Sequence, residues 1–214
     1  METEKILSYI DHTLLKAVSD RESIMSLCRE ALEYKTASVC IPPSYVKEVR
    51  ENFPGLNICT VIGFPLGYST TAVKAFEAED AVKNGADEID MVIDIGFVKN
   101  GRFDLVTEEI AAVRRAVGEK ILKVIIETCY LTDDEKIKLC RCVTDGGADY
   151  IKTSTGFGSA GANIADIRLF KENIGPNVKI KAAGGIRTKE EMEEFINAGC
   201  ARIGTSGAKN IVNN

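Results

Sequence analysis

Hydrophobic positions along the chain follow two patterns, short apolar runs and longer amphipathic segments. The short runs predict strands over residues 11–15, 37–41, 58–62, 88–93, 121–126, 150–153, 178–182 and 201–204. Between them, polar and apolar residues at helical spacing predict helices over residues 4–10, 19–34, 44–52, 71–84, 103–117, 132–144, 165–172 and 188–197. Capping-box spacing supports three of the helix starts, at Ser19–Glu22, Thr132–Glu135 and Thr188–Glu191.

Regular alternation of eight strands with helices predicts an α/β protein with a parallel sheet. The joints at 84–87, 146–149 and 198–201 resemble one another, so the βα unit is repeated along the chain. No Gly-x-Gly-x-x-Gly follows the first strand, which counts against an open dinucleotide-binding sheet. We therefore expect a TIM (β/α)8 barrel with a short N-terminal helix, forming a single catalytic domain over residues 1–214.

Composition limits the classes of partner. The 214 residues are 45% hydrophobic, which suits one domain with a full core, and the net charge of −5 argues against nucleic acid or an anionic membrane. There is no apolar run of roughly 20 residues and no signal-peptide pattern. Seven cysteines, several of them in apolar runs, indicate reduced buried thiols in a cytoplasmic protein, with neither a disulfide framework nor a metal site.

Charged residues inside predicted strands are the candidates for chemistry, because catalytic groups of TIM barrels gather where strands end. Alternation along 88–93 places Glu88 and Asp90 on one side of their strand, inside the barrel. Lys152 and Lys181 lie on neighbouring strands. Repulsion and burial should lower the pKa of the two amines and leave one neutral near pH 7 as a nucleophile, with Asp90 moving protons.

Loops at the ends of the last strands predict a phosphate site. Glycine-rich segments follow the seventh and eighth strands, and both can present free backbone amides. The segment after the sixth strand can close the third side. The phosphate-binding candidates in these loops are Thr155, Gly156, Gly184, Gly185, Arg187, Gly204 and Ser206.

Other polar residues leave alternatives open. His12 is the only histidine, which excludes a multi-histidine zinc site, and we expect an ordinary hydrogen-bonded histidine near the barrel floor or mouth. Cys40 either lines the pocket or packs in the core. Lys123 and Glu127 form either a structural pair or an outer shell of the site. Tyr68, in a loop, contacts either ligand or solvent.

Several motifs together resemble the deoxyribose-phosphate aldolase family of class I aldolases. They are Asp11-His12-Thr13, Ala37–Cys40, Gly85–Val92, Tyr150–Gly156, Lys181–Thr188 and Arg202–Ser206, nearly end to end. The resemblance implies that Lys152 forms a Schiff base, that Lys181 tunes it and transfers protons, and that Asp90 donates and accepts protons. It also assigns Asp11 and Thr13 to substrate binding.

The implied reaction is reversible cleavage of 2-deoxy-D-ribose 5-phosphate to D-glyceraldehyde 3-phosphate and acetaldehyde. Its partners are a small sugar phosphate and an aldehyde, it needs no metal or organic cofactor, and the family implies dimers or tetramers. The sequence departs from the family's pattern at two places that bear on the rate of the reaction and on the preference for a phosphorylated substrate. Phe157 stands where some members carry a lysine, and no tyrosine follows Tyr150, whereas some members have a C-terminal one.

Two other functions compete with this interpretation. A sugar-phosphate isomerase on the same barrel would use a carboxylate base without a covalent lysine. A catalytically silent barrel would bind a phosphorylated metabolite as a sensor.

Overall fold

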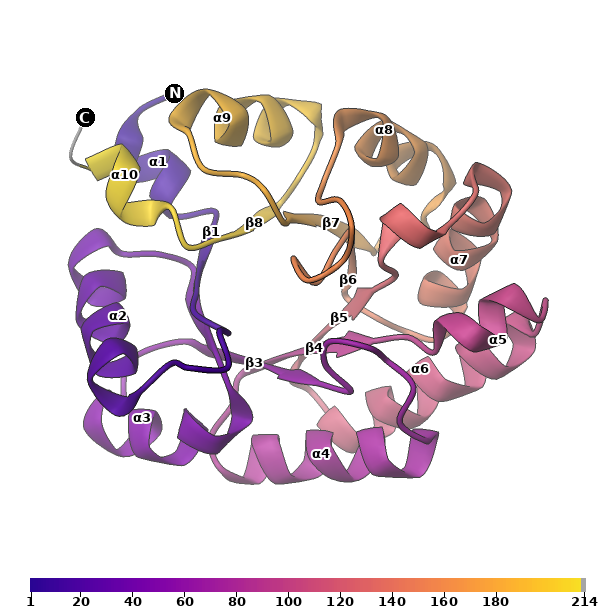
Figure 1. Ribbon diagram of the computed structural model, residues 1–214, viewed down its shortest axis with the longest axis horizontal. Helices are drawn as coiled ribbons and strands as arrows, with labels where there is room; N and C mark the ends of the chain where they lie inside the picture. Colours follow the sequence, from indigo (N-terminus) through magenta and orange to yellow (C-terminus); the bar gives the residue numbers. More distant parts are fainter. Residues whose placement is uncertain (213–214) are drawn as a thin grey trace.

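Eight parallel strands close into a barrel in the computed structural model, which describes residues 1–212 (Figure 1). Each strand pairs with the next along the chain, and β8 pairs with β1. The strands are β1 (Ile10–Thr13), β2 (Ser38–Ile41), β3 (Ile58–Ile62), β4 (Glu88–Val92), β5 (Ile121–Ile125), β6 (Tyr150–Lys152), β7 (Lys179–Ala183) and β8 (Arg202–Thr205). The predicted TIM barrel is confirmed.

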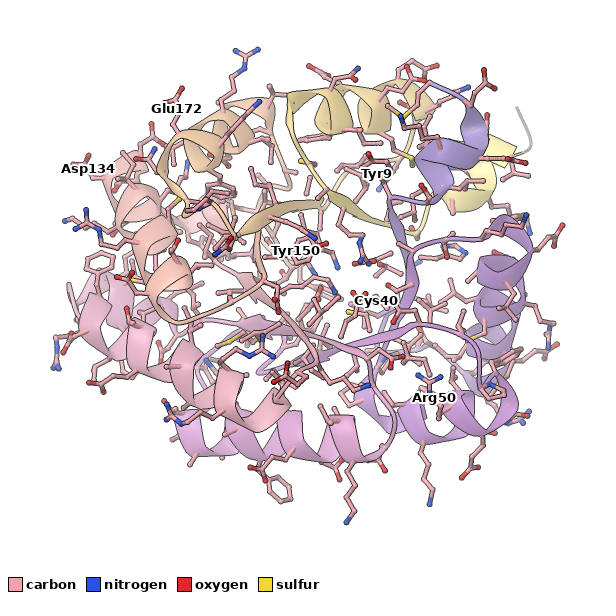
Figure 2. The ribbon with its side chains drawn as sticks, turned by 180° about the vertical axis from the view of Figure 1, so that it is seen from behind. Tyr9, Cys40, Arg50, Asp134, Tyr150 and Glu172 are labelled. Atoms are coloured by element: carbon pink, nitrogen blue, oxygen red, sulfur yellow. The ribbon has the colours of Figure 1, made fainter. Side chains whose placement is uncertain are left out.

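Helices form a ring around the strands, visible from both sides of the molecule (Figures 1 and 2). They are α1 (Thr3–Leu7), α2 (Arg21–Tyr34), α3 (Val46–Asn52), α4 (Thr71–Lys83), α5 (Ile95–Lys99), α6 (Phe103–Val117), α7 (Asp133–Asp145), α8 (Ile164–Asn173), α9 (Lys189–Ala198) and α10 (Ala208–Val212), with 3-10 turns at Pro43–Tyr45 and Thr128–Tyr130. Within residues 1–212, none of these helices combines the length and the apolar character that crossing a bilayer requires.

Side chains at the helix starts explain where several helices begin. The capping boxes of α7 and α9 are confirmed: Thr132 accepts from the backbone of Glu135, and Thr188 accepts from that of Glu191. The cap predicted at Ser19 is wrong by one position. Asp20 caps α2 by accepting a hydrogen bond from the Ser23 amide, so the helix begins at Arg21.

Differences from the predicted elements lie at strand ends and in short helices. The first strand ends at Thr13 instead of residue 15: the Leu14 amide still donates to the Cys40 carbonyl, and the chain then turns, with the Ser19 amide donating to the Lys16 carbonyl. The sequence also did not predict α5 and α10, which have five residues each and are too short for a helical period to show.

The apolar core lies between the strands and the helices, whereas the inside of the barrel is largely charged. Buried aliphatic side chains such as Ile89, Val124 and Ile151 face the helices in one continuous cluster. The alternate residues of the same strands, Glu88, Asp90 and others, are fully buried inside the barrel. Branched aliphatic residues usually fill this space, so the charged interior is the feature that directs attention to function.

Candidate active site

Three lysines converge on the carboxylate of Asp90. Lys152 and Lys181 lie side by side on β6 and β7, and each Nζ donates to Asp90 Oδ2 at 2.7 Å. Lys123, the strand neighbour of Asp90 on β5, donates from Nζ to Oδ1 at 2.9 Å. The three residues selected from sequence, Asp90, Lys152 and Lys181, therefore meet at one point, with Lys123 as a fourth member.

A second set of ion pairs lies beside this point. The Asp11 carboxylate contacts Lys181 Nζ at 2.5 Å and Arg202 Nη1 at 2.5 Å. Glu88 accepts from Arg202 at 3.2 Å and also pairs with Lys123. Both carboxylates are fully buried. Asp11 therefore lies within the charged interior, next to Lys181, and is not on the wall of the pocket described below, although the family resemblance assigns it to substrate binding.

The interior network fixes the charges of its members. Burial alone would raise the pKa of Asp90, but the ammonium groups of Lys123, Lys152 and Lys181 hold it well below its usual range. Burial would lower the pKa of Lys181, but the Asp11 and Asp90 carboxylates raise it above the ordinary value. The carboxylate of Asp90 is therefore ionised, and Lys181 is a cation in this structure.

The prediction that repulsion and burial lower the pKa of the amines is therefore wrong for Lys181. The sequence suggested that two adjacent lysines would repel each other and lower the pKa of the amines. In the structure Asp90 lies between Lys152 and Lys181, and Asp11 adds a second negative charge against Lys181. The carboxylates come from β1 and β4, far away in sequence, so the charge that surrounds each lysine does not follow from the two lysines alone.

A pocket of about 360 Å³ opens above the charged interior at the carboxyl ends of β1, β6, β7 and β8. Lys152 lines it and is 3% exposed, whereas Lys123 and Lys181 are 0% exposed and lie below. Nine residues selected from sequence contribute to the wall: Thr13, Lys152, Thr155, Gly156, Gly184, Gly185, Arg187, Gly204 and Ser206. Larger grooves of about 660 Å³ lie elsewhere, one between the surfaces of α8 and α9, but none of the lysines of the barrel interior reaches that groove.

Glycines form the wall after β7 because the backbone requires them. Gly184 and Gly185 have φ of +88° and +83°, a region in which side chains are strained. A Cβ on Gly204 would approach the Lys181 Cε to 3.2 Å, so this glycine leaves room for the lysine stem. Within residues 1–212, the amides of Gly185 and Ser206 donate to no protein acceptor and are free for a ligand.

Glu127 holds the loop that follows β6. Its carboxylate accepts from the Thr155 amide at 3.2 and 3.3 Å and also from the Thr155 hydroxyl. Its own backbone has a φ of +54°, which is unusual for a residue other than glycine. Burial raises the pKa of Glu127, although the hydrogen bonds from Thr155 act against it. Glu127 therefore belongs to the shell around the site, and its pairing with Lys123 is wrong.

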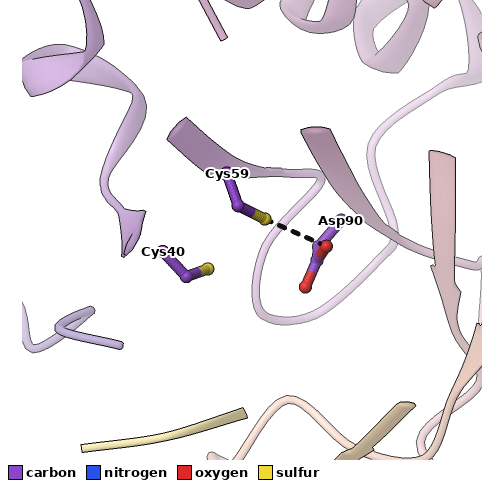
Figure 3. A group of neighbouring side chains, drawn as sticks. All are labelled: Cys40, Cys59 and Asp90. Carbon is purple, nitrogen blue, oxygen red and sulfur yellow. Dashed lines mark hydrogen bonds between the residues drawn. The ribbon is translucent and has the colours of Figure 1, made fainter. Parts of the chain in front are cut away.

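Two thiols lie next to Asp90 inside the barrel (Figure 3). Cys59 donates from Sγ to Asp90 Oδ1 at 3.1 Å, and Lys123 donates to the same sulfur at 3.3 Å. Cys40 is the strand partner of Cys59 and packs with it in a small buried cluster. Of the two alternatives for Cys40, the structure supports core packing.

These thiols and Asp90 are close enough to bind a metal ion but are unsuited to one. The ligand atoms of Cys40, Cys59 and Asp90 lie within 4.8 Å of one another. However, both Asp90 oxygens already accept from ammonium groups, and burial raises the pKa of the Cys59 thiol well above its usual value. A cation placed here would meet the lysines directly, and Cys59 would resist becoming a thiolate ligand.

His12 and Tyr68 lie outside the pocket. His12 extends from β1 toward α2, where its Nε2 hydrogen-bonds Glu30 Oε2 at 3.1 Å, and burial lowers its pKa despite this partner. It is the hydrogen-bonded histidine that the sequence suggested. Tyr68 is 73% exposed and does not contribute to the wall.

Sequence reasoning missed Lys16, which lines the pocket from the loop after β1. The sequence analysis considered charged residues inside the predicted strands, and Lys16 lies just beyond the first one. Its position after a strand end, at the barrel mouth, was the signal that could have identified it. Arg202 was quoted in a motif, but its contact with Asp11 spans 191 residues and has no local signal.

Comparison with known proteins identifies the family. Residues 5–210 match the model of the DeoC/LacD family aldolase. A deoxyribose-phosphate aldolase of Clostridium botulinum (strain Alaska E43 / Type E3) is 58% identical over 97% of this chain and 95% of its own length. One from Streptococcus pyogenes serotype M4 is 55% identical over 100% of this chain and 96% of its own length.

Solved structures agree with these relatives. A tetrameric deoxyribose phosphate aldolase from Aeropyrum pernix superimposes with a TM-score of 0.93 at 29% identity, covering 99% of this chain and 91% of that one. On the evidence of sequence and structure together, the chain belongs to the DeoC/LacD aldolase family.

Proposed function

We propose that this protein reversibly cleaves 2-deoxy-D-ribose 5-phosphate to D-glyceraldehyde 3-phosphate and acetaldehyde through a Schiff base on Lys152. The observation that carries the proposal is the position of Lys152, whose Nζ touches Asp90 below and whose side chain lines the pocket above. The relatives named deoxyribose-phosphate aldolase support the choice of substrate.

The contacts of the interior favour Lys152 as the nucleophile. Four cations, Lys123, Lys152, Lys181 and Arg202, face three carboxylates, Asp11, Glu88 and Asp90. Lys152 contacts one of these carboxylates, whereas Lys181 contacts two. A reaction at Lys152 therefore disrupts fewer ion pairs than one at Lys181, and Lys152 is the lysine of this group that lines the pocket.

The reaction then follows from the chemistry of an imine. The neutral Nζ of Lys152 attacks the C1 aldehyde of the open-chain sugar, and loss of water gives a protonated imine that the Asp90 carboxylate stabilises. Removal of the C3 hydroxyl proton turns the C3–O bond into the aldehyde of the departing fragment while the C2–C3 bond breaks, and D-glyceraldehyde 3-phosphate leaves with its C3–C4 bond intact. The electron pair of the broken C2–C3 bond forms an enamine on Lys152. The enamine is protonated at C2, and hydrolysis then releases acetaldehyde and the free lysine.

Asp90 and Lys181 carry protons in this scheme. Asp90 contacts both lysines through one oxygen, so a proton can pass between Lys152 and Lys181 without crossing the pocket. The glycine loops and Arg187 hold the phosphate at the far end of the substrate, and this remote binding orients C1 toward Lys152. These roles need no metal or organic cofactor.

The state of assembly is part of the proposal. We infer a homo-oligomer, a dimer or tetramer, supported by the tetrameric relative from Aeropyrum pernix. Apolar side chains exposed on one side of α4 and the loop before it, Leu66, Tyr68, Val73 and Phe76, offer an apolar surface for such contacts. Six of seven free cysteines are buried, which supports the cytoplasmic location that we also propose.

Reductive trapping tests the covalent step. Borohydride added with acetaldehyde or the sugar phosphate should attach one stable adduct to the protein, and peptide mass mapping should find it on Lys152. Lys152→Ala should remove the adduct and lower turnover at least about a thousandfold. Lys83→Ala, on the exposed end of α4, is the matched control and should keep both.

Three results would contradict the proposal. An adduct that survives Lys152→Ala but is lost with Lys181→Ala would exchange the two roles. Turnover of a sugar phosphate without any trapped adduct would indicate an isomerase with a carboxylate base. Tight binding without product in a coupled glyceraldehyde 3-phosphate assay would indicate a sensor.

A further inference from the structure

We propose that Lys16 is a phosphate-binding residue of the active site and, with Arg187, completes a pair of cations that hold the substrate's phosphate. This inference rests on the proposed function and names the residue that would give the site its preference for a phosphorylated sugar. Lys16 lines the same pocket as Lys152, although the two residues are far apart in the sequence.

The backbone fixes Lys16 at the barrel mouth. The amide of Leu14 donates to the Cys40 carbonyl at 2.9 Å, which anchors the start of the loop to β2. The carbonyl of Lys16 accepts from the Ser19 amide at 2.9 Å, which closes a tight turn before α2. The residue is therefore held on both sides by backbone hydrogen bonds, while its side chain is exposed.

The charges on the pocket wall show what the pocket can bind. Its cationic residues are Lys16, Lys152 and Arg187, and no Asp or Glu is among the residues that line it. The Lys152 ammonium is bound to Asp90, and the reaction uses this amine as the nucleophile. Within residues 1–212, the side chains of Lys16 and Arg187 form no ion pair, so both are available to a ligand of about two negative charges.

The order of the strands places these two cations on either side of the free amides. Strand β8 lies between β7 and β1. Arg187 follows β7, Lys16 follows β1, and Ser206 with its free amide follows β8 between them. A phosphate in front of Ser206 would therefore meet a cation on each side and backbone donors at its centre.

The wall formed by β6 and the loop after it adds no cation beyond Lys152. Phe157, after β6, packs edge-on against Phe64 after β3, with ring centroids 5.3 Å apart. Phe157 lines the pocket with an aromatic ring and no donor beyond its backbone. The positive side of the pocket is thus the side formed by β7, β8 and β1, and Lys16 accounts for the second cation there.

Substitution of Lys16 tests the proposal through the ratio of two substrates. Lys16→Met should raise KM and lower kcat/KM for 2-deoxy-D-ribose 5-phosphate by about tenfold to a hundredfold, the value of one charge-assisted contact. The same change should leave kcat/KM for 2-deoxy-D-ribose, which has no phosphate, within about twofold. Lys16→Arg should restore most of the loss, and Lys47→Met, on the exposed surface of α3, should have no effect.

Titration with inorganic phosphate provides a second measurement that needs no turnover. By calorimetry, wild type and Lys47→Met should bind phosphate equally, and Lys16→Met should bind it about tenfold more weakly. If Lys16→Met lowers kcat/KM equally for both sugars, or binds phosphate as tightly as the wild type, Lys16 is not a phosphate-binding residue. Neither result would contradict the proposed aldolase activity. If the wild type cleaves neither sugar, the proposed function is contradicted. The phosphate titration would then still test, independently of turnover, whether Lys16 binds phosphate.

Discussion

At the scale of single residues, the charge of a group depends on partners that are distant in sequence. Lys152 was identified at the end of its predicted strand and Lys181 within the neighbouring strand, because the catalytic groups of such barrels gather where strands end. Their electrostatic surroundings could not be predicted in the same way, since Asp11 contacts Lys181 from 170 positions earlier in the chain. Residue type and strand position predict which groups meet, whereas the state of each group requires the complete set of neighbours.

His12 offers a test of one buried group against pH. Burial lowers its pKa below the ordinary value of 6.5, so the folded protein favours the neutral ring. Between the folded and unfolded pKa values, the unfolded chain binds more protons, and the free energy of unfolding should fall as the pH drops below about 6.5. Urea unfolding at about pH 7.5 and 5.5 should show this fall in wild type.

His12→Gln is the comparison, because the chain has no other histidine. The variant should lose the part of the pH dependence that His12 contributes, while the carboxyl groups titrate as before. If the free energy of unfolding changes with pH by the same amount in both proteins over this interval, the pKa of His12 is the same in the folded and unfolded states.

At the scale of elements, hydrophobic patterning predicted the strands and the long helices well. Strands such as β3 and β5 are short, mainly apolar runs that are buried almost throughout, and capping residues marked the starts of α7 and α9. Short elements were missed because five residues contain little more than one helical turn. Lys16 was missed for a different reason, because it follows β1 and only charged residues inside strands were considered as candidates.

Close contact between two active-site loops gives a prediction at this scale. Ala162, after β6, donates its amide to the Gly184 carbonyl, and a Cβ on Gly161 would lie 2.1 Å from that oxygen. Gly161→Ala should push the two loops apart and lower kcat/KM for the phosphorylated sugar at least about tenfold. Steady-state kinetics will measure this change.

Gly55→Ala is the matched control for this substitution. A Cβ at Gly55 meets nothing within 4 Å, so the variant should retain wild-type kinetics. Comparable losses in both variants would mean that backbone freedom, and not the contact between the loops, explains the effect.

At the scale of the whole molecule, the charged interior joins strands from opposite sides of the barrel. Arg202 on β8 contacts Asp11 on β1 and also Glu88 on β4, which is not a neighbouring strand. Removing it would leave two buried carboxylates short of a partner. Arg202→Met should therefore lower the free energy of unfolding by about 3–5 kcal/mol, measured by urea denaturation.

An exposed arginine serves as the reference for this substitution. Arg21 pairs with Glu48 at the surface and its side chain is 64% exposed, so Arg21→Met should change stability by less than about 1 kcal/mol. A loss for Arg202→Met no larger than that for Arg21→Met would show that the interior carboxylates are stabilised by the lysines alone.

The pairing of β8 with β1 also has a consequence for synthesis in the cell. The pocket wall combines Thr13 and Lys16, translated among the first residues, with Gly204 and Ser206, translated among the last. Until β8 has been synthesised it cannot lie between its neighbours, and β1 and β7 have open edges. Catalytic competence therefore depends on the arrival of β8, and premature termination before Arg202 yields a product with an unfinished barrel and no enzyme activity.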